Sequence, residues 1–158
     1  MHEKVEMTYS VSLVLYNVLS QILYKEVTDE QGNVTVVERE LPFRLKYRIG
    51  RNIVPIQRDV VQFNHGKMAL LATYGELTPD GKDVVLKEDS KDEYREGLEK
   101  LLATKVTHTV VRLEPEDIDL IKEPLDISYD SIKVFIGFMM NEPELLKDIN
   151  IFPEFQEN

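Results

Sequence analysis

Apolar residues in this chain recur at spacings of three and four, the pattern that places them on one face of an α-helix. The first such stripe covers residues 9–24, where the apolar positions are Val11, Val14, Leu15, Val18, Leu19, Ile22 and Leu23. The hydroxyl of Ser10 or Ser12 is predicted to cap this helix. Residues 5–8, just before it, suit a short strand. The pattern thus predicts a strand followed by an amphipathic helix.

The most regular pattern lies between Pro42 and Tyr74. On its apolar face, spacings of four and three residues alternate, and a single lysine interrupts the apolar series. The residues are Ile49, Ile53, Ile56, Val60, Phe63, Lys67, Leu70 and Tyr74. Pro42 suits a first helical turn, and Gly75 is expected to act as a left-handed C-terminal cap. Pro55 removes a backbone donor inside the pattern. The segment is therefore predicted to be one long helix kinked near residues 50–55, or two separate helices.

Turn-forming residues mark two further elements. Gly32 lies in a polar cluster between β-branched stretches, which predicts a hairpin over residues 25–41. Gly81 follows Pro79 and Asp80, so residues 76–87 are predicted to form a second hairpin or a loop.

The C-terminal half contains two predicted helices and a strand. Ser90 and Glu93 have the spacing of a capping box, and the helix that they open, residues 90–104, has the core face Tyr94, Leu98, Leu101 and Leu102. Alternation over residues 105–113 predicts a strand, and Pro115 begins a helical turn that reaches residue 121. Ser128 is predicted to cap a helix over 129–140 whose inward residues are Ile132, Phe135, Ile136 and Met139.

These elements predict an α+β fold that is mainly α-helical. A long kinked central helix would be packed by three shorter helices, with one or two small β-hairpins. Residues 1–140 are expected to form a single globular domain, in which the hairpin over 25–41 is an insertion. The long helix repeats every 3.5 residues, the period of a coiled-coil seam, and this favours a homo-oligomer.

The remaining residues, 141–158, form a tail that is both acidic and apolar. Large apolar side chains left in water each forfeit about 1.5–3 kcal/mol, so the tail is predicted to dock on its own domain or on a partner. The candidate docking residues are Leu145, Leu146, Ile149, Phe152 and Phe155.

Composition excludes several function classes. The 158 residues suit one domain, and the absence of cysteine excludes disulfides, thiol nucleophiles and thiolate metal sites. The net charge of −10 argues against nucleic acid or an anionic membrane as the partner of the whole surface. The first residues do not read as a secretory signal, and the longest apolar run is too short to span a bilayer.

No chemical motif stands out in the sequence. The glycines lack the spacing of phosphate-binding loops, and His2, His65 and His108 share no ligand spacing. Four clustered carboxylates could offer oxygens to a hard cation, namely Glu114, Glu116, Asp117 and Asp119. The glycine and ligand spacing of a calcium loop is missing, however. The sequence therefore predicts a non-enzyme without catalytic residues, metal or cofactor.

One charged feature suggests a binding surface. Between Glu40 and Asp59 the chain carries bases and no acid, and four of them share one face of the predicted helix: Arg44, Arg48, Arg51 and Arg58. We call these four residues the basic stripe. It would dock an acidic protein, a neighbouring subunit or a phosphate backbone. Alternatively, it faces acids of the next helix within the same fold, namely Asp92, Glu93, Glu96 and Glu99.

The order of elements also carries a resemblance. Leu41-Pro42-Phe43-Arg44 opens the long helix, and Thr73-Tyr74-Gly75-Glu76 ends it. Leu101-Leu102 ends the next helix, and Asp126-Ile127-Ser128 precedes the last one. Over residues 9–140, this arrangement resembles small uncharacterised helical proteins encoded in tailed-bacteriophage and prophage genomes.

The resemblance implies a bacteriophage accessory or virion-associated protein, located in the host cytoplasm or incorporated in the virion. Such a protein is expected to be non-catalytic and to act through protein–protein binding. The partner would be a second copy, another phage protein or a host factor. No membrane is expected as a partner. Nucleic acid is expected to bind, if at all, only through the basic stripe. The alternative is an acidic DNA mimic that inhibits a host nucleic-acid or defence enzyme.

Overall fold

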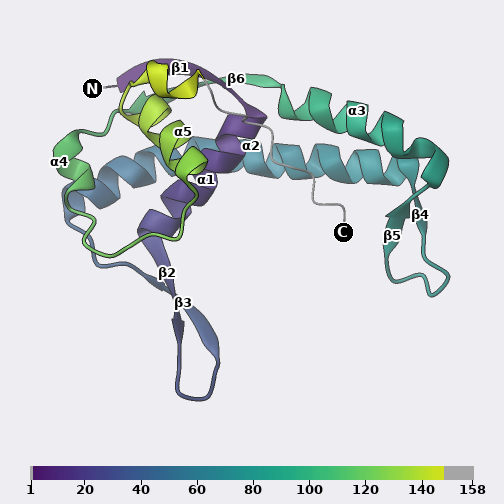
Figure 1. Cartoon of the computed structure of the whole chain (residues 1–158), viewed down its shortest axis with the longest axis horizontal. Helices are drawn as coiled ribbons and strands as arrows, with labels where there is room; N and C mark the ends of the chain where they lie inside the picture. The colour runs from purple at the N-terminus through teal and green to yellow at the C-terminus, as the bar shows by residue number, and fades with distance from the viewer. Residues whose placement is uncertain (1, 148–158) are drawn as a thin grey trace.

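The long helix α2, Phe43–Tyr74, is the element around which the rest of the chain is arranged (Figure 1). In the computed structural model, which describes residues 2–147, α2 continues unbroken through Pro55. The alternative of two separate helices is therefore wrong. Pro42 precedes the helix as its N-cap, where its missing N–H costs no helical hydrogen bond. The fold is mixed α+β with this helix at its centre, as predicted.

Helix α1, Tyr9–Leu23, crosses the first half of α2 (Figure 1). Its cap is Thr8, whose Oγ1 accepts a hydrogen bond from the N–H of Val11 at 3.3 Å. The predicted caps Ser10 and Ser12 are wrong, because both lie inside the helix and are buried. The main core joins α1, α2 and α5, and its fully buried side chains include Leu15, Leu19, Ile22, Leu45, Ile49, Ile56 and Met139.

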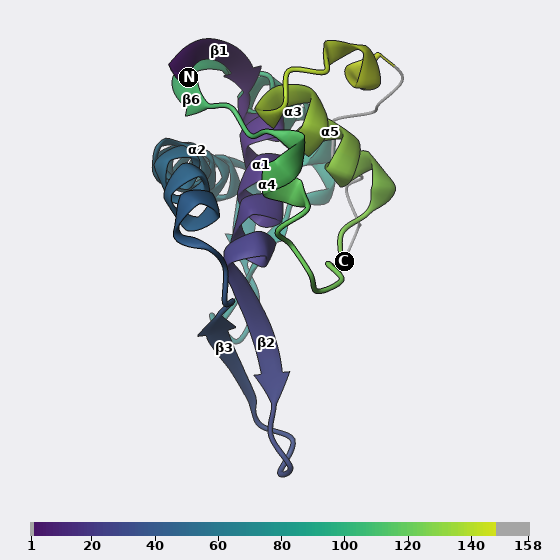
Figure 2. The same cartoon turned by 90° about the vertical axis from the view of Figure 1, so that its left-hand side faces the viewer.

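Three two-stranded antiparallel sheets complete the described fold. Strand β1, His2–Thr8, pairs with β6, Lys105–Val111. Strands β2, Tyr24–Thr28, and β3, Val34–Glu38, form a hairpin that extends away from the body (Figure 2). Strands β4, Gly75–Leu77, and β5, Val84–Leu86, form a second hairpin at the C-terminal end of α2. Both predicted hairpins are confirmed.

The second half of α2 forms an arm with helix α3, Lys91–Leu102, which runs beside it (Figure 1). Phe63, Leu98 and Leu102 make a separate small core there. A short 3₁₀ helix, Glu88–Ser90, precedes α3. Ser90 occupies the N-cap position, but its side chain makes no capping hydrogen bond. The predicted capping box is therefore wrong.

Gly75 is not the left-handed cap that the sequence suggests. Its φ is −99°, which is extended backbone open to any residue. A Cβ atom at this position would lie 2.5 Å from Cγ1 of Val84 in the paired strand. The Cβ would lie even closer to the carbonyl oxygen of Leu71, so glycine is needed here because α2 and β5 both approach closely, and not because the backbone requires a positive φ.

The C-terminal elements cover one side of α1. Helix α4, Pro115–Ile118, is a single turn, and α5, Tyr129–Met139, is capped by Ser128 as predicted, with its Oγ 3.2 Å from the N–H of Ser131. The inward face of α5 differs from the prediction at Ile132, which is 36% exposed, because the helix buries Val134, Phe135, Gly137 and Met139.

The start of the predicted tail packs on its own domain. A short 3₁₀ helix, Pro143–Leu146, lies against α5, where Leu146 sits over Gly137. Leu146 is half-buried and Leu145 is exposed. The other candidate docking residues, Ile149, Phe152 and Phe155, lie outside the described residues.

Candidate protein-binding surface

The basic stripe divides into a half that pairs with a buried acid, Arg44 and Arg48, and a half without an ion pair among the described residues, Arg51 and Arg58. Arg44 and Arg48 reach the carboxylate of Asp117, with Arg44 Nε 3.1 Å from Oδ1 and Arg48 Nη1 2.5 Å from Oδ2. Asp117 is fully buried. A buried carboxylate needs such partners, because an uncompensated charge is costly to remove from water. These two arginines therefore serve the fold, as the internal interpretation of the stripe expects.

The internal partner is nevertheless a different acid from the ones predicted. Asp117 belongs to α4, where its Oδ2 also accepts the N–H of Glu114 at 2.8 Å and closes a capping box. The predicted partners were acids of α3, which packs instead against the second half of α2. Of the acidic cluster, Asp117 is thus held by two arginines. Among residues 2–147, no group of three or more histidines and carboxylates is arranged to hold a metal ion.

Arg51 and Arg58 are exposed, and neither forms an ion pair within the described part of the chain. Together with Arg44 they follow a strict seven-residue spacing, which His65 continues. Between them runs a second seven-residue series of apolar residues whose exposed fractions are 52, 53, 44 and 67%: Tyr47, Val54, Val61 and Met68. We call these eight residues the outer seam of α2.

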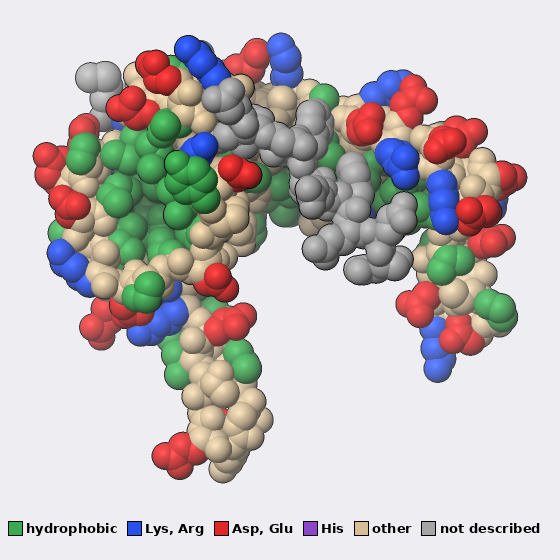
Figure 3. Space-filling view, in the orientation of Figure 1, with side chains coloured by type: hydrophobic (Ala, Val, Ile, Leu, Met, Phe, Trp, Pro, Cys, Tyr) green, Lys and Arg blue, Asp and Glu red, His purple; other side chains and the backbone are tan. Residues whose placement is uncertain are grey.

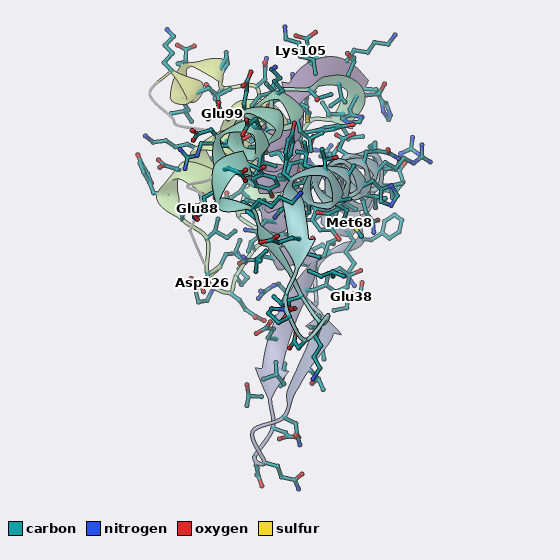
Figure 4. All side chains as sticks on the ribbon, turned by 90° about the vertical axis from the view of Figure 1, so that its right-hand side faces the viewer. Glu38, Met68, Glu88, Glu99, Lys105 and Asp126 are labelled. Atoms are coloured by element: carbon teal, nitrogen blue, oxygen red, sulfur yellow. The ribbon has the colours of Figure 1, made fainter. Side chains whose placement is uncertain are left out.

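The outer seam lies opposite the buried face of the same helix. The buried residues are Leu45, Ile49, Asn52, Ile56, Asp59 and Phe63. Met68, labelled in Figure 4, lies on the side of α2 that faces away from α3. The apolar residues of the outer seam are not the predicted core series, but they repeat with the same alternation of three and four. That repeat of apolar residues on the exposed face is a signal already present in the sequence.

The surface of the outer seam is hollowed at its centre. Five residues of α2 line a shallow depression of about 310 Å³: Val54, Gln57, Arg58, Val61 and Gln62. Two valines supply apolar lining, and Arg58 and two glutamines supply polar groups. Such a depression suits an apolar side chain from a partner, as in the knobs-into-holes packing of paired helices.

The charge of the outer seam is opposite to that of the whole chain. The single acidic residue of α2, Asp59, is buried and faces inward. Elsewhere the charges are mixed: red and blue side chains alternate along the α3 arm in Figure 3. A basic, partly apolar helix face on a chain of net charge −10 is therefore a local feature.

Asp59 lies in a polar cluster that could be mistaken for catalytic machinery. Its Oδ2 accepts the hydroxyl of Ser12 at 2.6 Å and lies 2.6 Å from Nε2 of His108. In a hydrolytic triad the histidine lies between the serine and the acid, so that it can take the serine proton. Here the carboxylate lies between them. This geometry ties α1 and β6 to α2, and it does not activate the serine.

Comparison of the chain with protein-family models, curated proteins and solved structures finds no match. Within residues 2–147, no helix combines the length and the apolar character needed to cross a membrane. The assignment of a function therefore rests on the surface geometry described above.

Proposed function

We propose that this is a non-catalytic protein of the bacteriophage accessory or virion-associated kind, which acts by binding another protein through the outer seam of α2. The observation that carries the proposal is the row of exposed apolar residues along one helix face, beside which the exposed arginines Arg51 and Arg58 stand seven residues apart. The partner we propose is an amphipathic helix with acidic residues beside its apolar positions.

The spacing of the outer seam supports a helical partner. Helices that pack side by side at a shallow angle contact one another every 3.5 residues, which makes a seven-residue repeat. The seam runs for about 36 Å, at 1.5 Å per residue from Arg44 to Met68. A partner helix of that length could cover all four apolar residues. Each large apolar side chain that becomes buried contributes about 1.5–3 kcal/mol.

The arginines determine the charge of the partner. Arg51 and Arg58 have exposed guanidinium groups, which bind carboxylates in a planar, two-pronged geometry. Carboxylates on a partner helix would pair with them at either side of Val54. A second copy of α2 is a poorer match, because a parallel pairing would set each arginine against its own equivalent.

A phosphate backbone is also a poorer match. Nucleic-acid binding depends on neutralising phosphates with many bases, whereas Arg44 and Arg48 already pair with Asp117. Contact with a phosphate backbone would bury little of the apolar surface of Tyr47, Val54, Val61 and Met68. The DNA-mimic alternative rests on the net charge, and some exposed carboxylates that it would use are paired with lysines, such as Glu88 with Lys91 and Glu96 with Lys100.

A designed peptide tests this proposal directly. The probe is a helical peptide with leucine at every first and fourth heptad position and glutamate at the flanking positions, and its binding is followed by fluorescence anisotropy. We expect the double variant Arg51→Glu and Arg58→Glu to weaken binding by at least about tenfold, since each lost charge pair of this kind is worth about 1 kcal/mol or more.

Two controls make the result specific. A peptide with lysine in place of glutamate should recover binding to the double variant. Lys82→Glu changes an exposed charge in the β4–β5 turn, outside the outer seam, and should bind as the wild type does. If the glutamate peptide binds the double variant and the wild type equally well, the outer seam is not the docking surface.

A further inference from the structure

The β2–β3 hairpin is a second surface, separate from the outer seam. It extends away from the helices, as Figures 1, 2 and 4 show from three sides. Ion pairs hold its base: Glu123 lies 3.1 Å from Lys25 and 2.5 Å from Arg39, and Glu38 lies 2.9 Å from Lys46. Every residue of β3 is exposed. A two-stranded hairpin without further packing is marginally stable in water.

The hydrogen bonds at the two ends of the hairpin fix which backbone groups point outward. The N–H of Arg39 donates to the carbonyl of Leu23 at the base, and the N–H of Asp29 donates to the carbonyl of Asn33 at the tip. Bonded and non-bonded pairs alternate along an antiparallel ladder. In the observed register, the non-bonded pairs are Tyr24–Glu38, Glu26–Val36 and Thr28–Val34.

The N–H and carbonyl groups of Val34, Val36 and Glu38 therefore point away from β2, along the outer edge of β3. Apart from Glu38 at its end, this edge lacks the usual protection of an exposed strand, which is a charge or a proline. Residues 34–37 carry neither, and Val34 and Val36 are 57% and 66% exposed. Strand β1, by contrast, carries Glu3, Lys4 and Glu6. The β3 edge offers both unpaired backbone groups and apolar side chains.

We propose that β3 pairs antiparallel with β3 of a second copy of the chain, across a two-fold axis at Val36, to form a four-stranded sheet. In this register Val36 lies opposite Val36 of the second copy, and Val34 lies opposite Glu38. All three carry outward backbone groups, so the two edges complement each other. This is the self-complementary contact that a two-fold symmetric dimer requires.

Charge does not oppose a second copy as the occupant of this edge, whose outward backbone groups are self-complementary. The only charged residue of β3, Glu38, faces a valine in the proposed register, so no like charges lie directly opposite each other. Lys46 of the same chain also lies beside Glu38. Edge pairing buries less than the roughly 1,200 Å² of a standard interface, so we expect a dimer that forms at micromolar concentration.

Proline variants test the proposal with a matched control. Val36→Pro removes an outward N–H that the hairpin itself does not use, and proline is tolerated on edge strands. Glu26→Pro removes the equivalent outward N–H from the opposite edge, on β2. Sedimentation velocity at roughly 10–100 μM should show a dimer for the wild type and for Glu26→Pro, and a monomer for Val36→Pro. Circular dichroism checks that both variants keep the wild-type fold.

Single cysteines give an independent readout, because the chain contains no other cysteine. Directly opposed residues of a bonded antiparallel pair have Cα atoms about 5.5 Å apart, within the range of a disulfide. Under mild oxidation Val36→Cys should form a covalent dimer and Glu26→Cys should not. The proposal is overturned by a monomeric wild type, by a Val36→Pro variant that still dimerises, or by Glu26→Cys cross-linking as well as Val36→Cys. The Arg51→Glu and Arg58→Glu variant should dimerise normally, so the two proposals fail separately.

Discussion

The side chain of Asn52 hydrogen-bonds to the backbone of Val111 in both directions. Its Nδ2 donates to the carbonyl of Val111 at 2.8 Å, and its Oδ1 accepts the N–H of Val111 at 2.7 Å. Strand β6 has β1 on one side, so Asn52 takes the place of a neighbouring strand on the other. Among side chains, only an amide offers a donor and an acceptor in this arrangement without a charge.

We expect Asn52→Leu to lower the free energy of unfolding by about 2–4 kcal/mol, since a buried backbone group left without a partner costs about 1–3 kcal/mol. Asn64→Leu changes an exposed position of the same helix and should stay within about 0.5 kcal/mol of the wild type. Urea denaturation measures both. Equal stability of the two variants would show that water replaces the amide without cost.

Asp117 should be the acid on which the paired half of the basic stripe depends. Asp117→Ala leaves Arg44 and Arg48 without their partner and should cost about 2–4 kcal/mol, somewhat less than a fully buried pair because both arginines keep some contact with water. Glu116→Ala, at an exposed neighbour, should be nearly neutral. The prediction is wrong if thermal denaturation ranks the two variants the other way.

The same chemical change should have opposite signs at two glycines of α2. A Cβ at Gly66 would lie 2.8 Å from Cδ2 of Leu101, so Gly66→Ala forces the end of this side chain to move and should cost about 1 kcal/mol. A Cβ at Gly50 would meet nothing within 4 Å. Gly50→Ala should therefore stabilise the helix by about 0.5–1 kcal/mol. Melting temperatures that move in the same direction for both variants would contradict this packing.

Acid should loosen the base of the β2–β3 hairpin. The hydrogen bond from Lys25 and the nearby charges of Lys25 and Arg39 hold the pKa of the Glu123 carboxyl below its ordinary value. A lowered pKa means that the stabilisation is complete above the ordinary value and disappears as the pH falls through the value in the folded protein. An NMR titration of Glu123 should give this lowered midpoint, and Arg39→Gln should move it upward. An unchanged midpoint in that variant would exclude Arg39 as a cause.

The limits of the sequence prediction are clearest along α2. The alternation of three and four predicts the helix and its extent correctly, but it selects Ile53 and Val60 for the core because they are apolar. The structure buries Asn52 and Asp59 instead and leaves Ile53 and Val60 half-buried. The polar partners come from distant elements, Val111 and His108 in β6 and Ser12 in α1. Periodicity contains no information about them.

The acids of the α4 region show the same limit. Glu114, Glu116, Asp117 and Asp119 are similar in the sequence, and only the packing of α4 against the first turns of α2 determines that Asp117 meets two arginines. By contrast, both hairpin turns could be predicted from their glycines. Gly32 and Gly81 have the positive φ values, 83° and 70°, that glycine favours. Local rules suffice for a turn, whereas an ion pair between distant segments requires the tertiary fold.

The pairing of β1 with β6 has a consequence for synthesis on the ribosome. Thr8 lies opposite Lys105, so β1 is made roughly a hundred residues before its partner strand, a delay of several seconds at the usual 5–20 residues per second. During that time α1 and α2 can already associate while β1 has no neighbour. Its charged residues, Glu3, Lys4 and Glu6, are the kind that keep an unpaired strand from aggregating. The nascent chain is thus expected to complete its sheet only after α3 has emerged.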